Sequence, residues 1–248
     1  MLNNIPLETA KRAIIGGLNE FCPELGSRAA EILTDSVRAN IHIVDNGKGQ
    51  MMACRPAGIT LQDLQDLGIY TSPEQHAELF DNERFPQTNT DNDFAIVDFE
   101  YDGTTGSVIY LAHETGHAIA DDLQREYGIS FRDFIIDNPE DPNNPAPQLE
   151  KQAYFVQAIV ERHLHEHGAS YGIDYQNPDQ DRLQSAWREA VSGVANKTFA
   201  RALALNDPSE RLQIVVAALT ENTDQDGVVM GRPAPASTFQ SGQSGPNS

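Results

Sequence analysis

Residues 94–126 read FAIVDFEYDGTTGSVIYLAHETGHAIADDLQRE, and this stretch decides the fold. Its first six residues are mostly apolar, β-branched or aromatic, which is typical of a strand. Residues 102–107 are rich in Gly, Thr and Ser, so they predict a turn that ends in side chains able to cap a helix. A helix is then expected from about residue 107 to 126. The order strand, turn, helix predicts a central helix that packs next to a short sheet.

The expected helix carries His113-Glu114-Thr115-Gly116-His117, an H-E-x-x-H motif. Residues four apart lie on one face of a helix, so both imidazoles can reach one metal ion. Two neutral imidazoles and a carboxylate suit zinc and leave its fourth position to a water molecule. Glu114 stands where it can take a proton from that water. The motif therefore predicts one Zn²⁺ per chain, with His113 and His117 as ligands and Glu114 as the general base.

The neighbours of the two histidines on this face are apolar or small, namely Ile109, Gly116 and Ala120. An imidazole in such surroundings needs a polar partner. Two core histidines bonded to the backbone would also meet that need, but the strand–turn–helix context favours a metal. Glycine costs about 1 kcal/mol in a helix interior. Gly116 therefore predicts that another segment approaches the helix closely.

The rest of the chain is mainly helical in pattern. β-branched residues at 41–44 and the segment 51–54 flank a strong turn signal at 45–47, which predicts a hairpin. Further helices are expected at 7–21, 26–39, 60–67, 73–83, 130–136, 148–167, 178–205 and 208–222. We therefore expect a mainly α fold with a small β-sheet (α+β). It would form a single zincin-like metallopeptidase domain over residues 1–222, followed by a disordered tail rich in Gly, Pro, Ser and Gln over residues 223–248.

The composition argues against several classes of partner. The net charge is −20, with no run of Lys or Arg, so neither nucleic acid nor an anionic membrane is expected to bind. No stretch has the roughly 18 apolar residues of a membrane span. The first residues do not read as a signal peptide, so the cytoplasm is the default expectation, and export by a route without such a signal stays open. Cys22 and Cys54 are too few for a thiolate zinc site and are expected to be free thiols.

The third zinc ligand has to come from another helix. The metzincin pattern requires Gly and His at positions that Ala120 and Leu123 occupy here. Glu150 and Glu161, close to three helical turns apart, are the two candidates on the next long helix. Glu150 is favoured, because it begins an apolar segment and Ala153, one turn later, leaves room for the first helix. Glu161 precedes a polar run and stays as the alternative.

Three histidines and two tyrosines further along could also take part in chemistry. His163 and His167 are four apart and, with His165, end the same helix, where imidazolium is favoured. Metal binding, or donation to an oxyanion in the active site, are the other interpretations. Tyr171 and Tyr175 are candidate catalytic donors to the oxyanion, on a glycine-containing loop that could close over substrate. Aromatic packing is the alternative role for each tyrosine.

Residues 97–103 and 108–118, which include the H-E-x-G-H-A sequence, resemble the thimet oligopeptidase and oligoendopeptidase F family of zinc peptidases, which are gluzincins. Residues 45–48 with Ala53 are similar to a degenerate form of the family's G-K-R-x-G-A segment. Residues 149–153 are similar to the segment that supplies the family's third ligand, a glutamate followed three residues later by a small residue. The resemblance implies that Glu150 is the third ligand.

The resemblance extends over roughly residues 25 to 165, with three departures. The chain is far shorter than typical members, which enclose a deep channel between two helical halves. The gap between the second histidine and Glu150 is longer. The family's later G-Y-x-x-x-Y-Y segment has no clear counterpart.

We therefore expect a zinc metalloendopeptidase that hydrolyses peptide bonds in a peptide or protein substrate, with Glu114 activating the water. One alternative is a secreted effector or toxin metalloprotease that cuts one specific protein, which the missing half of the channel and the tail favour. The other is a non-catalytic zinc-binding module that retains the fold. The intact Glu114 argues against that second alternative, because a structural zinc site has no use for a base.

Overall fold

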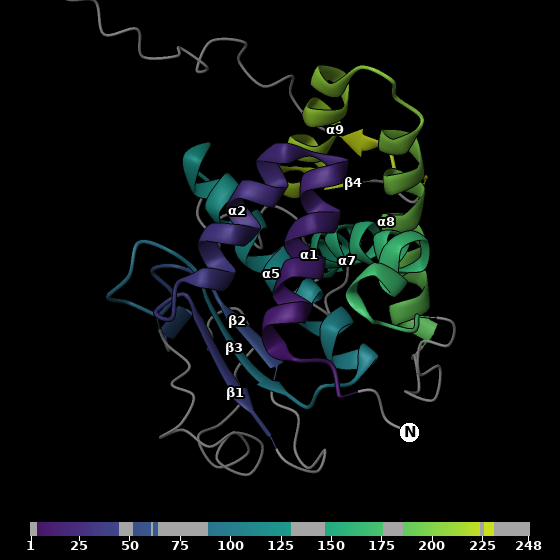
Figure 1. The fold of residues 1–248 in the computed structure, drawn as a ribbon. Coiled ribbons are helices and arrows are strands. Elements are labelled where there is room, and N and C mark those ends of the chain that lie inside the picture. The colour runs from purple at the N-terminus through teal and green to yellow at the C-terminus, as the bar shows by residue number, and fades with distance from the viewer. Residues whose placement is uncertain are drawn as a thin grey trace, which may run out of the picture.

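The computed structural model describes residues 4–44, 52–60, 62–63, 89–129, 147–175, 186–223 and 226–230. These residues form an α+β fold in which helices pack together and a three-stranded mixed sheet lies at one side (Figure 1). The helices are α1 (Leu7–Phe21), α2 (Pro23–Thr34), α5 (Thr105–Glu126), α7 (Pro147–His167), η1 (Gly168–Tyr171, 3₁₀), α8 (Ala186–Leu203) and α9 (Pro208–Thr220). The strands are β1 (Ala39–Ile43), β2 (Met52–Arg55), β3 (Ile96–Tyr101), β4 (Asn222–Thr223) and β5 (Val229–Met230).

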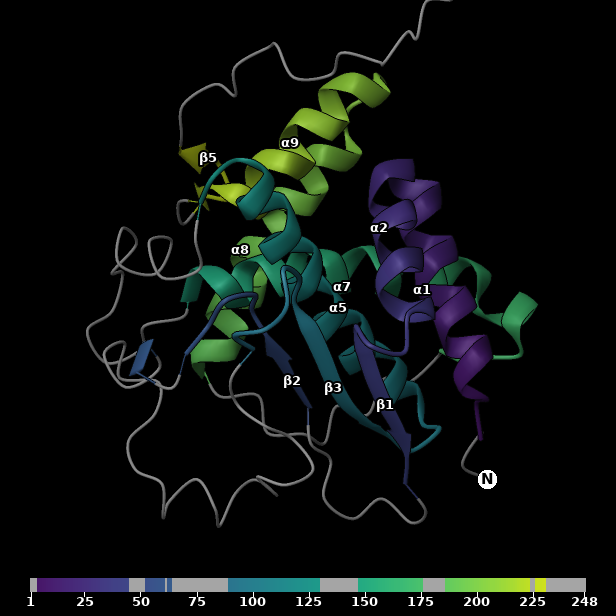
Figure 2. The ribbon, with the colours of Figure 1, turned by 90° about the vertical axis from the view of Figure 1, so that its left-hand side faces the viewer.

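The sheet corrects the predicted hairpin. β1 and β2 do not pair with each other; β3 lies between them, parallel to β1 and antiparallel to β2 (Figure 2). All six residues of β3 are buried, whereas β1 and β2 each have one buried residue, Ala39 and Arg55. A strand that is covered on both faces belongs in the centre of a sheet, and half-exposed strands belong at its edges. The turn at 45–47 lies outside the described residues.

Asp98 ties the three strands together from the middle of β3. Its carboxylate forms a buried ion pair with Arg55 of β2 and accepts a hydrogen bond of 3.0 Å from the amide of Asn40 on β1. A buried carboxylate is tolerated only when its oxygens are paired in this way. Asp98 therefore helps to fix how β1 and β2 align with β3.

α5 is the central helix and positions the H-E-x-x-H motif. Its N-cap is Thr104, whose hydroxyl accepts a hydrogen bond of 3.1 Å from the backbone N–H of Ser107. This is the capping that the turn at 102–107 predicted. α5 packs against α7 and also against β2 and β3. The motif therefore lies between the sheet and α7.

Two other boundaries differ from the expected ones. α2 ends at Thr34 and not at residue 39, because Asp35 has an extended backbone (φ −86°, ψ 114°) and Ala39 already begins β1. At the other end, residues 226–230 are not part of a disordered tail. Gly227 has φ +69°, and β5 pairs antiparallel with β4. A glycine in the left-handed region allows the chain to turn back on itself. The predicted helices at 73–83 and 130–136, most of the one at 60–67, and residues 231–248 lie outside the described residues.

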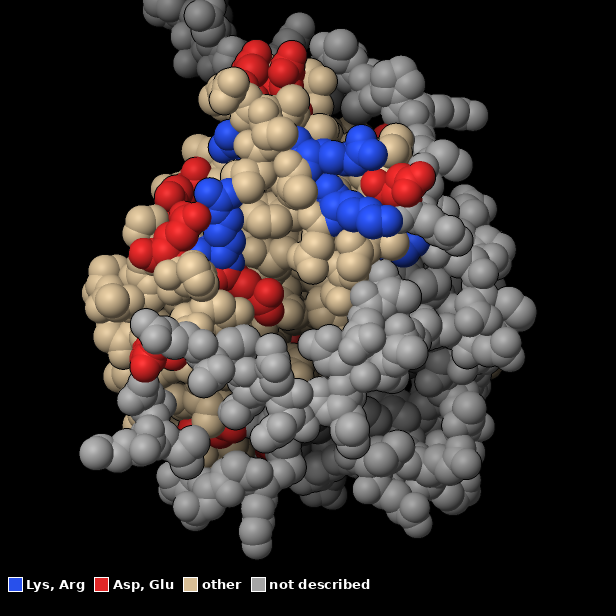
Figure 3. All heavy atoms as spheres, turned by 90° about the vertical axis from the view of Figure 1, so that its right-hand side faces the viewer, with Lys and Arg blue, Asp and Glu red and all other residues tan. Residues whose placement is uncertain are grey.

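Charges of both signs share the surface. In Figure 3, Lys and Arg side chains gather on the upper half of one face, with Asp and Glu side chains beside them. Arg162 pairs with Glu166 at 2.9 Å on α7, and Arg28 of α2 pairs with Glu126 of α5 at 2.7 Å. Cys22 and Cys54 are free thiols, of which Cys22 is buried and Cys54 is partly buried. None of the helices in the described part of the chain combines the length and the apolar character that crossing a membrane requires.

Candidate metal centre

The structure brings the two motif histidines together with Glu150. His113 and His117 project from α5, and Glu150 lies in the first turn of α7. His113 Nε2 is 3.3 Å from Glu150 Oε2, and His117 Nε2 is 3.5 Å from Glu150 Oε1. Ligand atoms around a tetrahedral zinc ion are about 3.3–3.5 Å apart when the bonds are about 2.0–2.2 Å. The separations and the donor set therefore fit one zinc ion.

The ring of His113 is held in one orientation by residues of α7. Its Nδ1 lies 3.1 Å from the side-chain Oε1 of Gln157, and an amide oxygen can only accept, so Nδ1 carries the proton. In the neutral ring, Nε2 then carries the lone pair that could bind a metal. In the protonated ring, Nε2–H donates to Glu150 instead. The ring also packs edge-on against Tyr154, with centroids 4.7 Å apart. Metal-binding histidines commonly have such an outer partner, because it fixes both tautomer and orientation.

Glu161, the alternative third ligand, contacts Gln157, which in turn contacts His113. It accepts a hydrogen bond of 2.7 Å from the side-chain amide of Gln157. Burial raises the pKa of Glu161, while the Gln157 amide and the charge of His113 act to lower it. Glu150 therefore contacts both imidazoles, whereas Glu161 is linked to His113 through Gln157.

The surroundings of Glu150 favour its ionised carboxylate form. Burial acts to raise the pKa of Glu150, but hydrogen bonds and charge interactions with His113 and His117 outweigh it and lower the pKa well below its usual range. The side chain keeps 26% of its area exposed. Water can therefore reach the point on which the three residues converge.

Glu114 follows His113 on α5 and lies where this helix packs against β2. It is buried, and its carboxylate accepts a hydrogen bond from the backbone N–H of Cys54. Burial raises the pKa of Glu114 to about 7; the charge of Glu150 also raises it, and His113 and the Cys54 bond lower it. A carboxyl group with a pKa near neutrality is suited to exchange protons as a general base.

Gly116 sets the distance between α5 and α7. A Cβ atom at this position would lie 2.9 Å from the Cβ of Val156 and 3.0 Å from the Cα of Ala153. Both contacts are too close, so an alanine here would force the helices apart. The close approach that Gly116 predicted is confirmed. It places Glu150, one turn before Ala153, against His117, which follows Gly116.

The two candidate tyrosines lie in different places. The hydroxyl of Tyr171 is 3.0 Å from Nε2 of His163, which follows Glu150 by 13 positions, about 20 Å along α7. Tyr171 is therefore not brought to the histidines of α5. Burial and the charge of Glu161 raise the pKa of Tyr175, and its Cβ would lie 3.8 Å from a Cβ at Gly168. Of the two, Tyr175 is the remaining candidate donor.

The sequence did not identify Gln157 as the partner of His113, nor the Cys54 N–H as the partner of Glu114. Gln157 lies about two turns after Glu150, so the spacing alone places it on the same face of α7. Its contact depends on how α7 docks on α5. The Cys54 contact depends on the packing of β2 against α5, which no local pattern records.

Comparison with known proteins gives no match among family models, curated proteins or solved structures. Among the described residues, His113, His117 and Glu150 offer ligand atoms that lie within 4.8 Å of one another.

Proposed function

We propose that this chain is a zinc-dependent endopeptidase that hydrolyses peptide bonds, with zinc on His113, His117 and Glu150 and with Glu114 as the general base. The observation that carries the proposal is the position of the Glu150 carboxylate, within 3.5 Å of Nε2 of both imidazoles. The helix-borne motif supplies the other two ligands and the base. The resemblance to the thimet oligopeptidase and oligoendopeptidase F family supports the same assignment.

The residues around the site have separate tasks. When bound, zinc would polarise the scissile carbonyl and lower the pKa of a coordinated water. Glu114 takes the proton of the attacking water and passes it to the leaving amine. Gln157 would hold the His113 ring with Nε2 toward a bound metal. Tyr175 is the candidate for a hydrogen bond to the oxyanion, which stabilises negative charge that develops during attack.

A peptide substrate is favoured by the position of β2. Among the described strands, β2 pairs only with β3, so its other side forms an edge of the sheet. The backbone N–H of Cys54 in β2 reaches Glu114, so this edge lies directly beside the base. An extended peptide can add to a sheet edge through main-chain hydrogen bonds. This geometry would bring a scissile bond next to Glu114.

A zinc module without catalysis accounts less well for Glu114. Burial of the Glu114 carboxyl group raises its pKa and costs free energy. A purely structural zinc site has no need of such a buried carboxyl group. The full set of base, ligands and adjacent sheet edge therefore supports hydrolysis.

Chelation tests the proposed function. The purified chain is assayed on a mixture of quenched fluorescent peptides and on denatured casein. Removal of metal with 1,10-phenanthroline is expected to abolish hydrolysis, and added Zn²⁺ is expected to restore it, because the water is activated only beside the metal. Hydrolysis that continues undiminished in the metal-free chain would contradict the proposal.

A further inference from the structure

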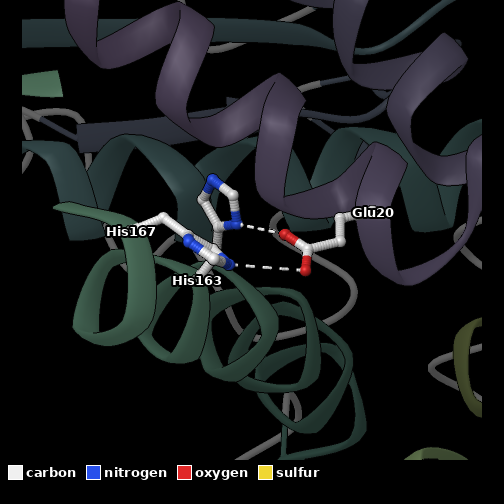
Figure 4. A group of neighbouring side chains, drawn as sticks. All are labelled: Glu20, His163 and His167. Atoms are coloured by element: carbon white, nitrogen blue, oxygen red, sulfur yellow. Dashed lines mark hydrogen bonds and ion pairs between the residues drawn. The ribbon is translucent and has the colours of Figure 1, made fainter. Parts of the chain in front are cut away.

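A second group of metal-ligating side chains lies at the far end of α7. Figure 4 shows Glu20, near the end of α1, facing His163 and His167 of α7. His163 Nδ1 is 2.7 Å from Glu20 Oε2, and His167 Nε2 is 3.5 Å from Glu20 Oε1. The side chain of His163 is 9% exposed, whereas those of His167 and Glu20 are 47% and 55% exposed. One imidazole is therefore anchored in the protein, and the other two groups face solvent.

Two glycines of α1 allow this arrangement. A Cβ at Gly17 would lie 2.8 Å from Cβ of His163, and one at Gly16 would lie 2.5 Å from the hydroxyl of Tyr171. Each glycine inside a helix costs about 1 kcal/mol relative to alanine. The pair lets α7 and η1 lie directly against α1, which brings Glu20, one turn later, to the two imidazoles.

Tyr171 prepares His163 to be a ligand. Its hydroxyl is 3.0 Å from Nε2 of His163, on the opposite side of the ring from Glu20. If Nε2–H donates to this hydroxyl, the lone pair of Nδ1 faces the carboxylate and His167. Histidines that bind metals usually donate their other ring N–H to a fixed partner in this way.

A plain hydrogen bond between His163 and Glu20 accounts for only part of the geometry. It explains the distance of 2.7 Å. His167, one turn further along α7, also directs Nε2 at the other oxygen of the same carboxylate, so both imidazoles converge on Glu20. All three ligand atoms lie within 4.8 Å of one another, so one ion could reach them once the 2.7 Å contact opens by about 0.6 Å to the separation found around tetrahedral zinc.

We propose that Glu20, His163 and His167 form a second metal site, for a transition-metal dication such as Zn²⁺. Two imidazoles and one carboxylate suit zinc and its neighbours, whereas Mg²⁺ and Ca²⁺ take oxygen ligands. Water completes the coordination on the exposed side. The site ties α1 to the end of α7, across 143 positions of sequence. A metal that binds only the folded chain stabilises it by mass action.

The test is a count of zinc sites in the full chain and in single variants. The metal-free chain is titrated with Zn²⁺ by calorimetry, and its metal content is measured after dialysis. His167→Gln and Glu20→Gln change exposed ligands and leave the core intact. His165→Gln, an exposed histidine of the same helix turn outside the cluster, is the matched control, and His117→Gln removes a ligand of the first site.

We expect two equivalents of zinc in the wild type and in His165→Gln, and one in His167→Gln and Glu20→Gln. Tyr171→Phe is expected to weaken the second site about 10- to 100-fold, because it removes the partner of His163. Zinc should also raise the melting temperature of wild type more than that of His167→Gln. Two unaltered equivalents in His167→Gln and Glu20→Gln would overturn the second site.

A wild type that binds a single equivalent separates the two proposals. If His117→Gln loses that equivalent and His167→Gln keeps it, the second site is overturned and the proposed peptidase centre stands. If His167→Gln loses it and His117→Gln keeps it, the second site stands and the peptidase centre falls. No binding at all overturns both.

Discussion

Glu114→Gln is expected to keep its zinc and to lose peptidase activity by about 10²- to 10⁴-fold, the usual contribution of a general acid–base group. Glutamine has the same size and can still accept the hydrogen bond from the Cys54 N–H, so the fold around β2 should persist. It cannot take a proton from water. The variant also removes a buried ionisable group, so its free energy of unfolding should not fall.

The measurement for this prediction is kcat/KM on the quenched peptides, together with zinc content. Glu126→Gln is the matched control, because Glu126 ends the same helix, is exposed and pairs with Arg28 far from the motif. It should retain wild-type activity. Cleavage by Glu114→Gln at the wild-type rate would rule out Glu114 as the base.

Glu150→Gln is expected to lose the zinc of the first site and, with it, all measurable hydrolysis. The carboxylate of Glu150 is the only anionic group among the three ligands and contacts both imidazoles. A neutral amide is a much weaker zinc ligand. Gln157→Ala should have a smaller effect, about a 10- to 100-fold loss of zinc affinity, because it only frees the His113 ring.

Zinc content is best measured here in a His167→Gln background, so that the Glu20 cluster adds no metal to the count. Glu166→Gln, an exposed glutamate of α7, serves as the control and should bind one equivalent. Glu161→Gln tests the alternative third ligand and should keep that equivalent. If Glu161→Gln lost the zinc and Glu150→Gln kept it, the assignment of the third ligand would be wrong.

The parts of the fold that follow local rules were predictable. The strand, the capped turn and α5 follow from residues 94–126, and the helices from apolar spacing. The close contact of α5 with α7 followed from Gly116, since a glycine in a helix interior needs a packing reason. The position of Glu150 beside the two histidines also agrees with the prediction from the small Ala153, while its role as a ligand stays a prediction.

The parts that depend on distant pairing were not predictable. β3 lies between β1 and β2 although it follows them by more than forty residues. The turn at 45–47 therefore wrongly predicted that β1 and β2 pair with each other. The contact of Gln157 with His113 needs the docked helix pair. Glu20 contacts His163 across 143 positions of sequence. Gly16 and Gly17 allow this contact, but in the sequence they indicate only a helix of lower stability.

The most direct test of the account is to locate the metal by anomalous scattering at the zinc edge in crystals of the zinc-loaded His167→Gln chain. The account predicts one peak at about 2.0–2.1 Å from Nε2 of both His113 and His117 and about 2.0–2.2 Å from a Glu150 oxygen, with a water in the fourth position. Two imidazoles bound to main-chain carbonyls with no peak between them, or a metal closed off by four protein ligands, would contradict it.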